Sequence, residues 1–190
     1  IEGSTGRKAN VFVRLPSQRY DAWMLPRVLV VAGSDSSGGA GLQADTKTIT
    51  VLGGYAATAV TALTAQNTLG VAAVMPVAPE FVAQQMEVVL TDIGADCIKT
   101  GMLGGADTIE IVVRVLERLA PCTPLVVDPV MQAKGGAALL EAGALHTLKR
   151  RLIPRAALVT PNVPEAEALT GAQIDSTESM TNAASLLLAL

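Results

Sequence analysis

The segment VLVVAGSDSSGGAGLQAD, residues 28–45, contains the change of pattern that decides the fold. An apolar run gives way to serines and glycines, and a helical pattern follows, so the segment predicts a strand, a loop and a helix. A loop of this kind leaves N–H groups of the first helical turn without partners, and the helix dipole favours a polar or anionic ligand there. We therefore predict a ligand-binding loop. The alternative is a glycine-rich turn that binds nothing.

Two common nucleotide-binding motifs do not fit this loop. Gly39, Gly41 and Ala44 match the G-x-G-x-x-A pattern of dinucleotide sites. Such a site also needs a carboxylate about 20 residues further on for the ribose, and residues 46–79 contain no Asp or Glu. A P-loop needs Gly-Lys-Ser/Thr at the start of the helix, and that sequence is absent there. The loop therefore predicts a different kind of site.

The composition points to one α/β domain that binds small molecules. The chain has 190 residues, of which 50% are hydrophobic and only 3% aromatic. A core of Val, Leu, Ile and Ala is typical of a parallel sheet covered by helices on both faces. The net charge of −3 argues against a nucleic-acid partner. The expected ligands are therefore small.

The uncharged stretch from residue 48 to residue 79 raises the question of a membrane span. Gly53-Gly54 and Gln66-Asn67 divide it into pieces too short to cross a bilayer, so we expect buried strands and no membrane partner. Cys97 and Cys122 lack metal-ligand spacing, which favours packing roles in a reduced, cytoplasmic protein. The single histidine, His146, is expected on a solvated helix face.

The pattern along the chain predicts two parts. Residues 1–23 differ in composition, because they contain three of the five aromatic residues and precede Met24; we interpret them as a leader or non-native extension. Residues 24–190 form the predicted domain, a three-layer α/β/α fold with a mostly parallel central sheet. Strands are expected at 28–32, 57–64, 71–75, 96–99, 124–128 and 156–160, and helices at 39–52, 79–93, 107–119, 141–152, 161–171 and from 176 onward. The last helix has no stop signal, so we expect the fold to lack its C-terminal part.

Polar residues recur where the predicted strands end, and parallel strands place those ends at one ligand-binding edge. Asp128 follows an apolar strand and precedes a proline, which suits a metal ligand; a helix cap or a salt bridge is the alternative. Asn162 and Glu165, spaced N-x-x-E at a helix start, can orient metal-bound water and a nucleotide phosphate. The amide of Gln66 can donate to and accept from the edge of an aminopyrimidine, or it can cap a loop.

Five segments, taken in this order, resemble the hydroxymethylpyrimidine/phosphomethylpyrimidine kinases of thiamine biosynthesis, within the ribokinase-like family, over residues 28–190. They are AGSDSSGGAGLQADTKT (32–48), TALTAQNTLGV (61–71), IKTGMLG (98–104), VVDPVMQAKGG (126–136) and TPNVPEAEALTG (160–171). Pyridoxal kinases share the N-x-x-E and D-P-V-M patterns, but they do not share this first loop together with AQNT.

The resemblance implies that a phosphoryl group passes from MgATP to the hydroxymethyl oxygen of the pyrimidine, and that a second transfer gives the diphosphate. The substrate-binding residues it implies are Gly33, Asp45, Gln66, Met102 and Val130. Asn162 and Glu165 are implied for the nucleotide and its phosphates, and Asp128 and Glu165 for Mg²⁺.

One feature of the family is missing from the 190 residues. The resemblance implies a glycine-rich segment near the C-terminus that supplies the anion hole and the catalytic residue, and no such segment occurs before Leu190. We therefore expect no catalytic residue within this chain, no turnover by it alone, and a homodimer when the protein is complete. The alternative functions are a pyridoxal-type vitamin kinase and a non-catalytic pyrimidine-binding module.

Overall fold

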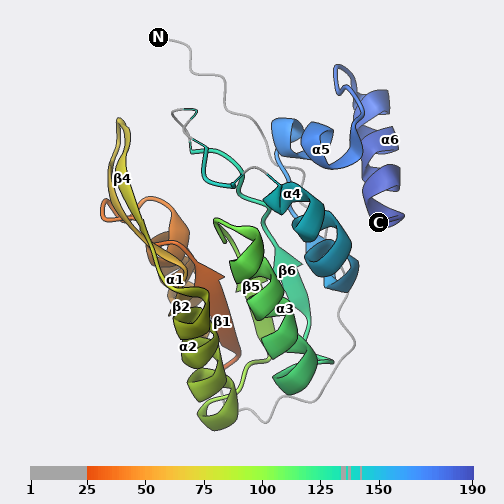
Figure 1. Cartoon of the computed structure of the whole chain (residues 1–190). Helices are drawn as coiled ribbons and strands as arrows, with labels where there is room; N and C mark the ends of the chain where they lie inside the picture. Colours follow the sequence, from red (N-terminus) through yellow and green to blue (C-terminus); the bar gives the residue numbers. More distant parts are fainter. Residues whose placement is uncertain (1–24, 134–135, 137, 142) are drawn as a thin grey trace.

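The computed structural model describes residues 25–133, 136, 138–141 and 143–190, and at its centre lies a five-stranded sheet (Figure 1). The strand order is β2-β1-β5-β6-β7, and every neighbouring pair is parallel. The strands are β1 (Arg27–Ala32), β2 (Tyr55–Val60), β5 (Cys97–Thr100), β6 (Leu125–Val127) and β7 (Leu158–Val159). Their carboxyl ends lie at one edge of the sheet, as the sequence predicts. The predicted leader, residues 1–23, lies outside the described residues.

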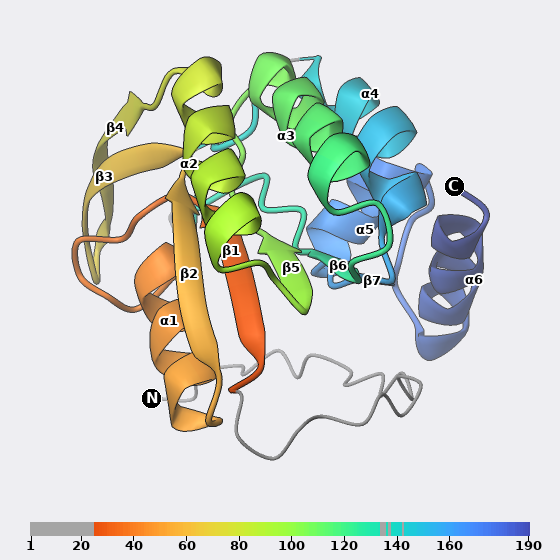
Figure 2. The ribbon, with the colours of Figure 1, turned by 90° about the horizontal axis from the view of Figure 1, so that it is seen from below.

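Helices cover both faces of the sheet, which confirms the predicted three-layer arrangement. Helix α1 (Gly41–Val51) lies on one face, and α2 (Pro79–Asp92) and α3 (Ala106–Leu119) lie on the other (Figure 2). Alternate residues of β1 supply the two cores: Val30 packs with the α1 side, whereas Leu29 belongs to the larger cluster that includes α2 and α3. This period of two is what buries a parallel strand on both faces.

The predicted strand at residues 57–64 is wrong in one respect, because the chain leaves the main sheet at Thr61. Strand β2 ends at Val60, and β3 (Ala62–Asn67) pairs with β4 (Gly70–Pro76) in a separate antiparallel hairpin. The Thr61 backbone N–H still donates to the carbonyl of Ala32, and its hydroxyl donates to the carbonyl of Met102 at 2.6 Å. The polar groups of the buried Thr61 are therefore hydrogen-bonded, and the chain can pass from one sheet to the other here without a glycine or a proline.

The C-terminal half also differs from the prediction at one helix. In place of a helix over 141–152, α4 (Ala144–Thr147) begins later, because Gly143 has a left-handed φ of 90°. It continues into a π-helical turn, η1 (Leu148–Leu152), and a 3₁₀ turn, η2 (Ile153–Arg155). Two helices follow β7, namely α5 (Val163–Thr170), which ends at Gly171 as predicted, and α6 (Thr177–Leu188). They lie beside each other at the β7 end of the molecule (Figure 2).

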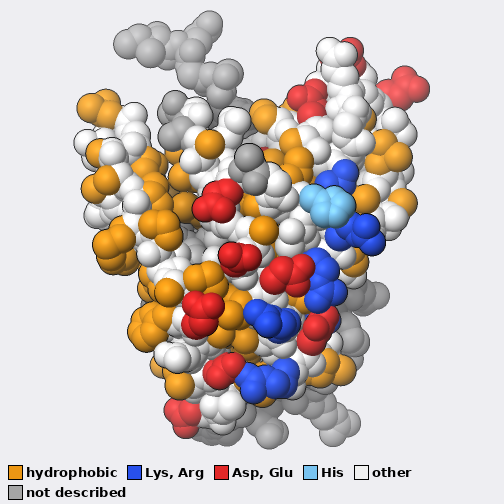
Figure 3. Space-filling model, viewed as in Figure 1, with side chains coloured by type: hydrophobic (Ala, Val, Ile, Leu, Met, Phe, Trp, Pro, Cys, Tyr) orange, Lys and Arg blue, Asp and Glu red, His pale blue; other side chains and the backbone are white. Residues whose placement is uncertain are grey.

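The surface in Figure 3 carries two distinct regions. Apolar side chains gather over the β3–β4 hairpin and α2, where Leu69, Met75 and Phe81 are exposed. Charged side chains gather over α3 and the η turns, in pairs such as Arg151 with Glu110. His146 is exposed, as predicted, and Cys122 is exposed although a packing role was predicted for it. Within the described residues, no helix is both long and apolar enough to span a bilayer.

Candidate functional site

The first loop, between β1 and α1, is closed by its own aspartate. The carboxylate of Asp35 accepts hydrogen bonds from the N–H groups of Ser37, Gly39 and Ala40 at 2.8–3.0 Å, and from the Ser37 hydroxyl at 2.8 Å. These three N–H groups precede the first turn of α1, for which a ligand was predicted; within that turn the Leu42 N–H donates to the Gly33 carbonyl, and a ligand at the turn stays a prediction. The backbone can fold around the Asp35 carboxylate because small residues follow it directly.

The environment of Asp35 keeps its side chain ionised. Burial, which leaves the residue 2% exposed, acts to raise its pKa. The hydrogen bonds from the Ser37 hydroxyl and from the backbone of Ser37, Ala40 and Gly39 outweigh burial, so the pKa lies below the ordinary value. Asp35 is thus a charged organiser of the loop.

Two glycines allow close packing in this loop, Gly41 within the loop and Gly33 against the turn after β5. The Gly33 carbonyl accepts from the Leu42 N–H at 3.0 Å, and a Cβ on Gly41 would stand only 2.4 Å from that oxygen. A Cβ on Gly33 would stand 3.1 Å from the sulfur of Met102. Glycine is therefore needed at position 41 for close backbone approach. The structure brings two predicted substrate-binding residues, Gly33 and Met102, into contact.

Gln66 is attached to the same loop through a serine that the sequence analysis did not single out. The Ser36 hydroxyl accepts from the Gln66 N–H and donates to the Gln66 carbonyl, both at 2.8 Å. The hairpin register shifts between Ala65, which pairs with Ala73, and Gln66, which pairs with Val71. Its side-chain oxygen lies 3.3 Å from the Thr64 hydroxyl. The bulge and Ser36 therefore hold Gln66 over the first loop.

The middle of the edge carries a lysine between two carboxylates. The ammonium of Lys99, at the end of β5, lies 2.7 Å from Oδ2 of Asp45 on α1 and 3.7 Å from Oδ2 of Asp128 after β6. All three side chains are about four-fifths buried. The sequence did contain a signal for this arrangement, because Lys99 lies in an otherwise uncharged strand of a sheet with both faces covered, and a buried lysine needs an acidic partner.

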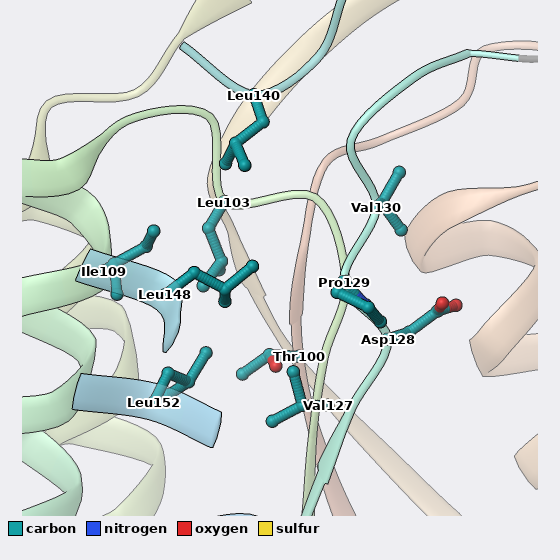
Figure 4. Close-up of a pocket in the computed structure, with 11 residues that line it drawn as sticks. Thr100, Leu103, Ile109, Val127, Asp128, Pro129, Val130, Leu140, Leu148 and Leu152 are labelled. Carbon is teal, nitrogen blue, oxygen red and sulfur yellow. The ribbon is translucent and has the colours of Figure 1, made fainter. Parts of the chain in front are cut away.

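Asp128 and Val130 occupy the next position along the edge. The Asp128 N–H donates to the Thr100 carbonyl at 2.9 Å, which continues the β5–β6 ladder, and Val130 N–H donates back to the Asp128 carbonyl at 2.8 Å. Figure 4 shows the Asp128 carboxylate pointing away from the leucines that line the neighbouring cavity. That cavity leaves about 10 Å³ for the centre of a water molecule, so it is a packing gap too small for a pyrimidine.

Asn162 and Glu165 form a capping box at the start of α5. The Asn162 side chain accepts from the Glu165 N–H at 2.9 Å, and Glu165 Oε2 accepts from the Asn162 N–H at 2.8 Å. Glu165 is 6% exposed. Helix capping therefore accounts for the N-x-x-E spacing locally. The box also fixes both side chains after β7, at the sheet edge where β6 ends in Asp128.

The donor set at this edge suits a hard divalent cation. Mg²⁺ is commonly held by one or two carboxylates together with water and substrate phosphates, so it does not need a cage of protein ligands. Within the described residues no three His, Cys, Asp or Glu side chains form a metal cluster. The ammonium of Lys99 lies 3.7 Å from Asp128, so the salt bridge that was the alternative for this carboxylate is present. The metal roles of Asp128 and Glu165 stay predictions, and one oxygen of Glu165 is engaged in capping.

The predicted substrate residues thus fall into two connected groups. Gln66, Gly33 and Met102 are linked through the first loop, and Asp45 and Val130 are linked through Lys99 and Asp128. Gly101 joins the two groups, because it lies between Lys99 and Met102, and a Cβ there would stand 3.3 Å from the Lys99 nitrogen.

Comparison with known proteins identifies close relatives. The family described as phosphomethylpyrimidine kinase matches residues 35–190. A hydroxymethylpyrimidine/phosphomethylpyrimidine kinase from Bacillus subtilis is 50% identical over 161 residues, which are 85% of this chain and 59% of that protein. The chain therefore spans about three-fifths of the length of this curated relative.

Solved structures agree with this result. The crystal structure of a phosphomethylpyrimidine kinase from Clostridium difficile matches with a TM-score of 0.80 and 42% identity, over 86% of this chain and 72% of that one. A pyridoxal kinase from Staphylococcus aureus, solved with AMP-PCP and pyridoxal, matches with a TM-score of 0.76 and 38% identity, over 87% of this chain and 59% of that one.

Proposed function

The chain belongs to the phosphomethylpyrimidine kinase family, and from this membership we propose that the protein carrying it transfers the γ-phosphoryl group of MgATP to hydroxymethylpyrimidine and then to its monophosphate. The products are the monophosphate and the diphosphate used for thiamine biosynthesis. ATP as donor is supported by the AMP-PCP bound in a related pyridoxal kinase. The chain is 38% identical to that enzyme, so pyridoxal phosphorylation is the second candidate.

One observation carries the proposal: the amide residue Gln66 is hydrogen-bonded to Ser36 of the first loop, and the same edge of the sheet carries Lys99, whose ammonium lies 3.7 Å from the carboxylate of Asp128. A kinase of this kind needs a pocket for the acceptor beside a carboxylate that holds a metal, because phosphoryl transfer depends mainly on positioning and charge stabilisation. In our proposal Gln66 pairs with the amino edge of the pyrimidine. Gly33, Asp45, Met102 and Val130 line the same pocket.

The remaining residues serve the nucleotide side. Asp128 holds the metal or its water, and Asn162 and Glu165 orient metal-bound water and phosphate from the start of α5. A carboxylate has two oxygens and several acceptor positions, so capping by Glu165 is compatible with this role. Mg²⁺, when bound, would neutralise charge on the transferred group. The anion hole and the catalytic residue are expected from a glycine-rich segment beyond these residues.

The first test is substrate binding, measured by calorimetric titration with hydroxymethylpyrimidine and with pyridoxal. Gln66→Leu keeps the side-chain size and removes both hydrogen-bonding groups, so affinity for the pyrimidine should fall by about 1–3 kcal/mol. Gln84→Leu makes the same change on the exposed face of α2 and should bind as the wild type does. Equal binding by wild type and Gln66→Leu would remove Gln66 from the site. Tighter binding of pyridoxal would favour the second candidate.

The second test is turnover. ATP-dependent phosphorylation should be measured for a polypeptide of these 190 residues and for one extended through the glycine-rich segment of the family. We expect the longer protein to turn over, and the shorter one to bind the pyrimidine with turnover lower by more than about 10³, since removing one anion-hole donor alone costs on the order of 10²–10³. Equal turnover would place the activating group within the present residues. Binding without turnover by both would indicate a binding module.

A further inference from the structure

We propose that Lys99 is a positioning residue that couples the metal side of the site to the acceptor side, by acting as the shared counter-ion of Asp128 and Asp45. The proposal rests on the proposed function for the roles of the two carboxylates. Lys99 itself has no role in that function as stated above.

The three residues come from three different elements. Lys99 belongs to β5, where Ile98 and Thr100 on either side of it are fully buried; as alternate strand residues, these two point to the opposite face of the sheet from Lys99. The Lys99 side chain therefore extends on the α1 side, where Asp45 meets it. Asp128 approaches from the end of the neighbouring strand β6. One ammonium thus bridges the helix that follows the first loop and the strand that carries the proposed metal ligand.

The space around the ammonium is matched to it. A Cβ on Gly101 would stand 3.3 Å from the Lys99 nitrogen and 3.0 Å from the Cβ of Ala32. A side chain at position 101 would therefore press against β1 and the ammonium together. The absence of a side chain at Gly101 therefore gives the Lys99 ammonium room between the two carboxylates.

The contact of Lys99 with Asp45 is shorter than its contact with Asp128, and this difference suggests which carboxylate a metal ion would bind. The 2.7 Å contact with Asp45 is a charge-assisted hydrogen bond, whereas the 3.7 Å approach to Asp128 is longer than a hydrogen bond. Asp128 can therefore exchange its ammonium neighbour for a divalent cation at little cost. A cation held by Asp128 would repel the ammonium and leave it paired with Asp45 alone, which would hold that carboxylate in place for the acceptor. Metal binding should strengthen pyrimidine binding, and by linkage the reverse should hold.

Two binding measurements test this without turnover, in wild type, Lys99→Met, Lys99→Arg and Lys149→Met. Free Mn²⁺, used as the metal probe, is titrated by electron paramagnetic resonance, with Asp128→Asn identifying the share bound at that carboxylate. Hydroxymethylpyrimidine is titrated by calorimetry with and without Mg²⁺. In Lys99→Met we expect Mn²⁺ to bind roughly three- to tenfold tighter and the pyrimidine to bind roughly tenfold weaker, and we expect Mg²⁺ no longer to affect pyrimidine affinity.

The controls separate positioning from mere structural damage. Lys99→Arg keeps the charge and should restore the wild-type pattern, and Lys149→Met makes the same substitution in η1 and should leave both affinities unchanged. A general loss of structure would weaken both ligands, so parallel weakening, or no change in either, would overturn the proposal. If Lys99→Met does not fold, the wild type still decides, because pyrimidine affinity independent of Mg²⁺ would also overturn it. Failure of the wild type to bind pyrimidine would instead reject the proposed function, whereas the Mn²⁺ titration would still test the relation of Lys99 to Asp128.

Discussion

In the first loop, the carboxylate of Asp35 is 2% exposed and accepts four hydrogen bonds from the residues that follow it. At the neighbouring edge of β5 and β6, Asp45 and Asp128 are less buried and share one ammonium. A carboxylate whose acceptor positions are filled by its own backbone has little left for a ligand. Two carboxylates that share one cation keep acceptor capacity and a net negative charge. The comparison gives Asp35 a structural role, and in our proposal it leaves ligand chemistry to Asp45 and Asp128.

The largest effect on stability should come from Asp35→Asn. The amide keeps one acceptor oxygen and turns a donor toward N–H groups that also donate, so buried donors lose their partner. We expect the free energy of unfolding to fall by about 2–4 kcal/mol, measured by urea denaturation. Asp92→Asn, at an exposed position on α2, is the matched control and should change it by less than about 0.5 kcal/mol. Equal effects of the two substitutions would contradict the structural role of Asp35.

The same variant makes a prediction about pH. The native pKa of Asp35 lies below its ordinary value of 3.8, so the folded state binds this proton less readily than the unfolded state does. The carboxylate therefore contributes stability above pH 3.8 and loses it as the pH falls through the lower native pKa. The difference between wild type and Asp35→Asn should stay constant from about pH 7 to 5 and shrink below about pH 4. A difference that remained constant in strong acid would contradict this.

The backbone conformation of the first loop can be disturbed without changing the charge of Asp35. Gly41 has a φ of +55°, and its Cβ would meet the Gly33 carbonyl at 2.4 Å; Gly53 has a φ of +81° with no atom within 4 Å. Both alanine variants carry backbone strain, but only Gly41→Ala adds a clash with main chain. We expect a loss of about 2–3 kcal/mol for Gly41→Ala and about 1 kcal/mol for Gly53→Ala, again by urea denaturation. Equal losses would show that the loop can shift to admit a side chain.

The sequence alone was enough for the sheet and the main helices, because apolar periodicity and glycine stops record local structure directly. The sequence did not predict where a strand ends when a hydrogen-bonding side chain, and no glycine or proline, ends it. At Thr61 the chain changes sheet inside an apolar run, and the hydroxyl that makes this possible bonds to Met102, 41 residues away. The π-helical turn at 148–152, which packs against α3, likewise has no local signal in the sequence.

Some features of the site were likewise predicted from the sequence, and others were not. Gly33 and Met102 were expected together, and they are neighbours, since a Cβ on Gly33 would stand 3.1 Å from the Met102 sulfur. The role of Asp35 was missed because a glycine-rich loop before a helix predicts an external anion equally well; the sequence Asp-Ser-Ser-Gly-Gly was the available signal for an internal one. Lys99 was among the polar residues expected at the strand ends, but its pairing was missed because its partners Asp45 and Asp128 are distant in sequence and only the tertiary fold brings them together.

The smallest effect on stability should come from the second region, and it completes the comparison. Asp45→Asn removes the 2.7 Å partner of Lys99, but the ammonium keeps Asp128 nearby, and all three side chains retain some contact with water. No buried charge is left alone, so the free energy of unfolding should fall by no more than about 1 kcal/mol, well below the loss for Asp35→Asn. Pyrimidine affinity, by contrast, should fall by about tenfold or more, since in our proposal this carboxylate lines the pocket.

Urea denaturation and calorimetric titration of Asp45→Asn and Asp35→Asn test whether the two carboxylates differ in this way. Should Asp45→Asn cost as much stability as Asp35→Asn while binding the pyrimidine normally, both carboxylates would be structural, and the ligand chemistry would have to lie elsewhere on the edge.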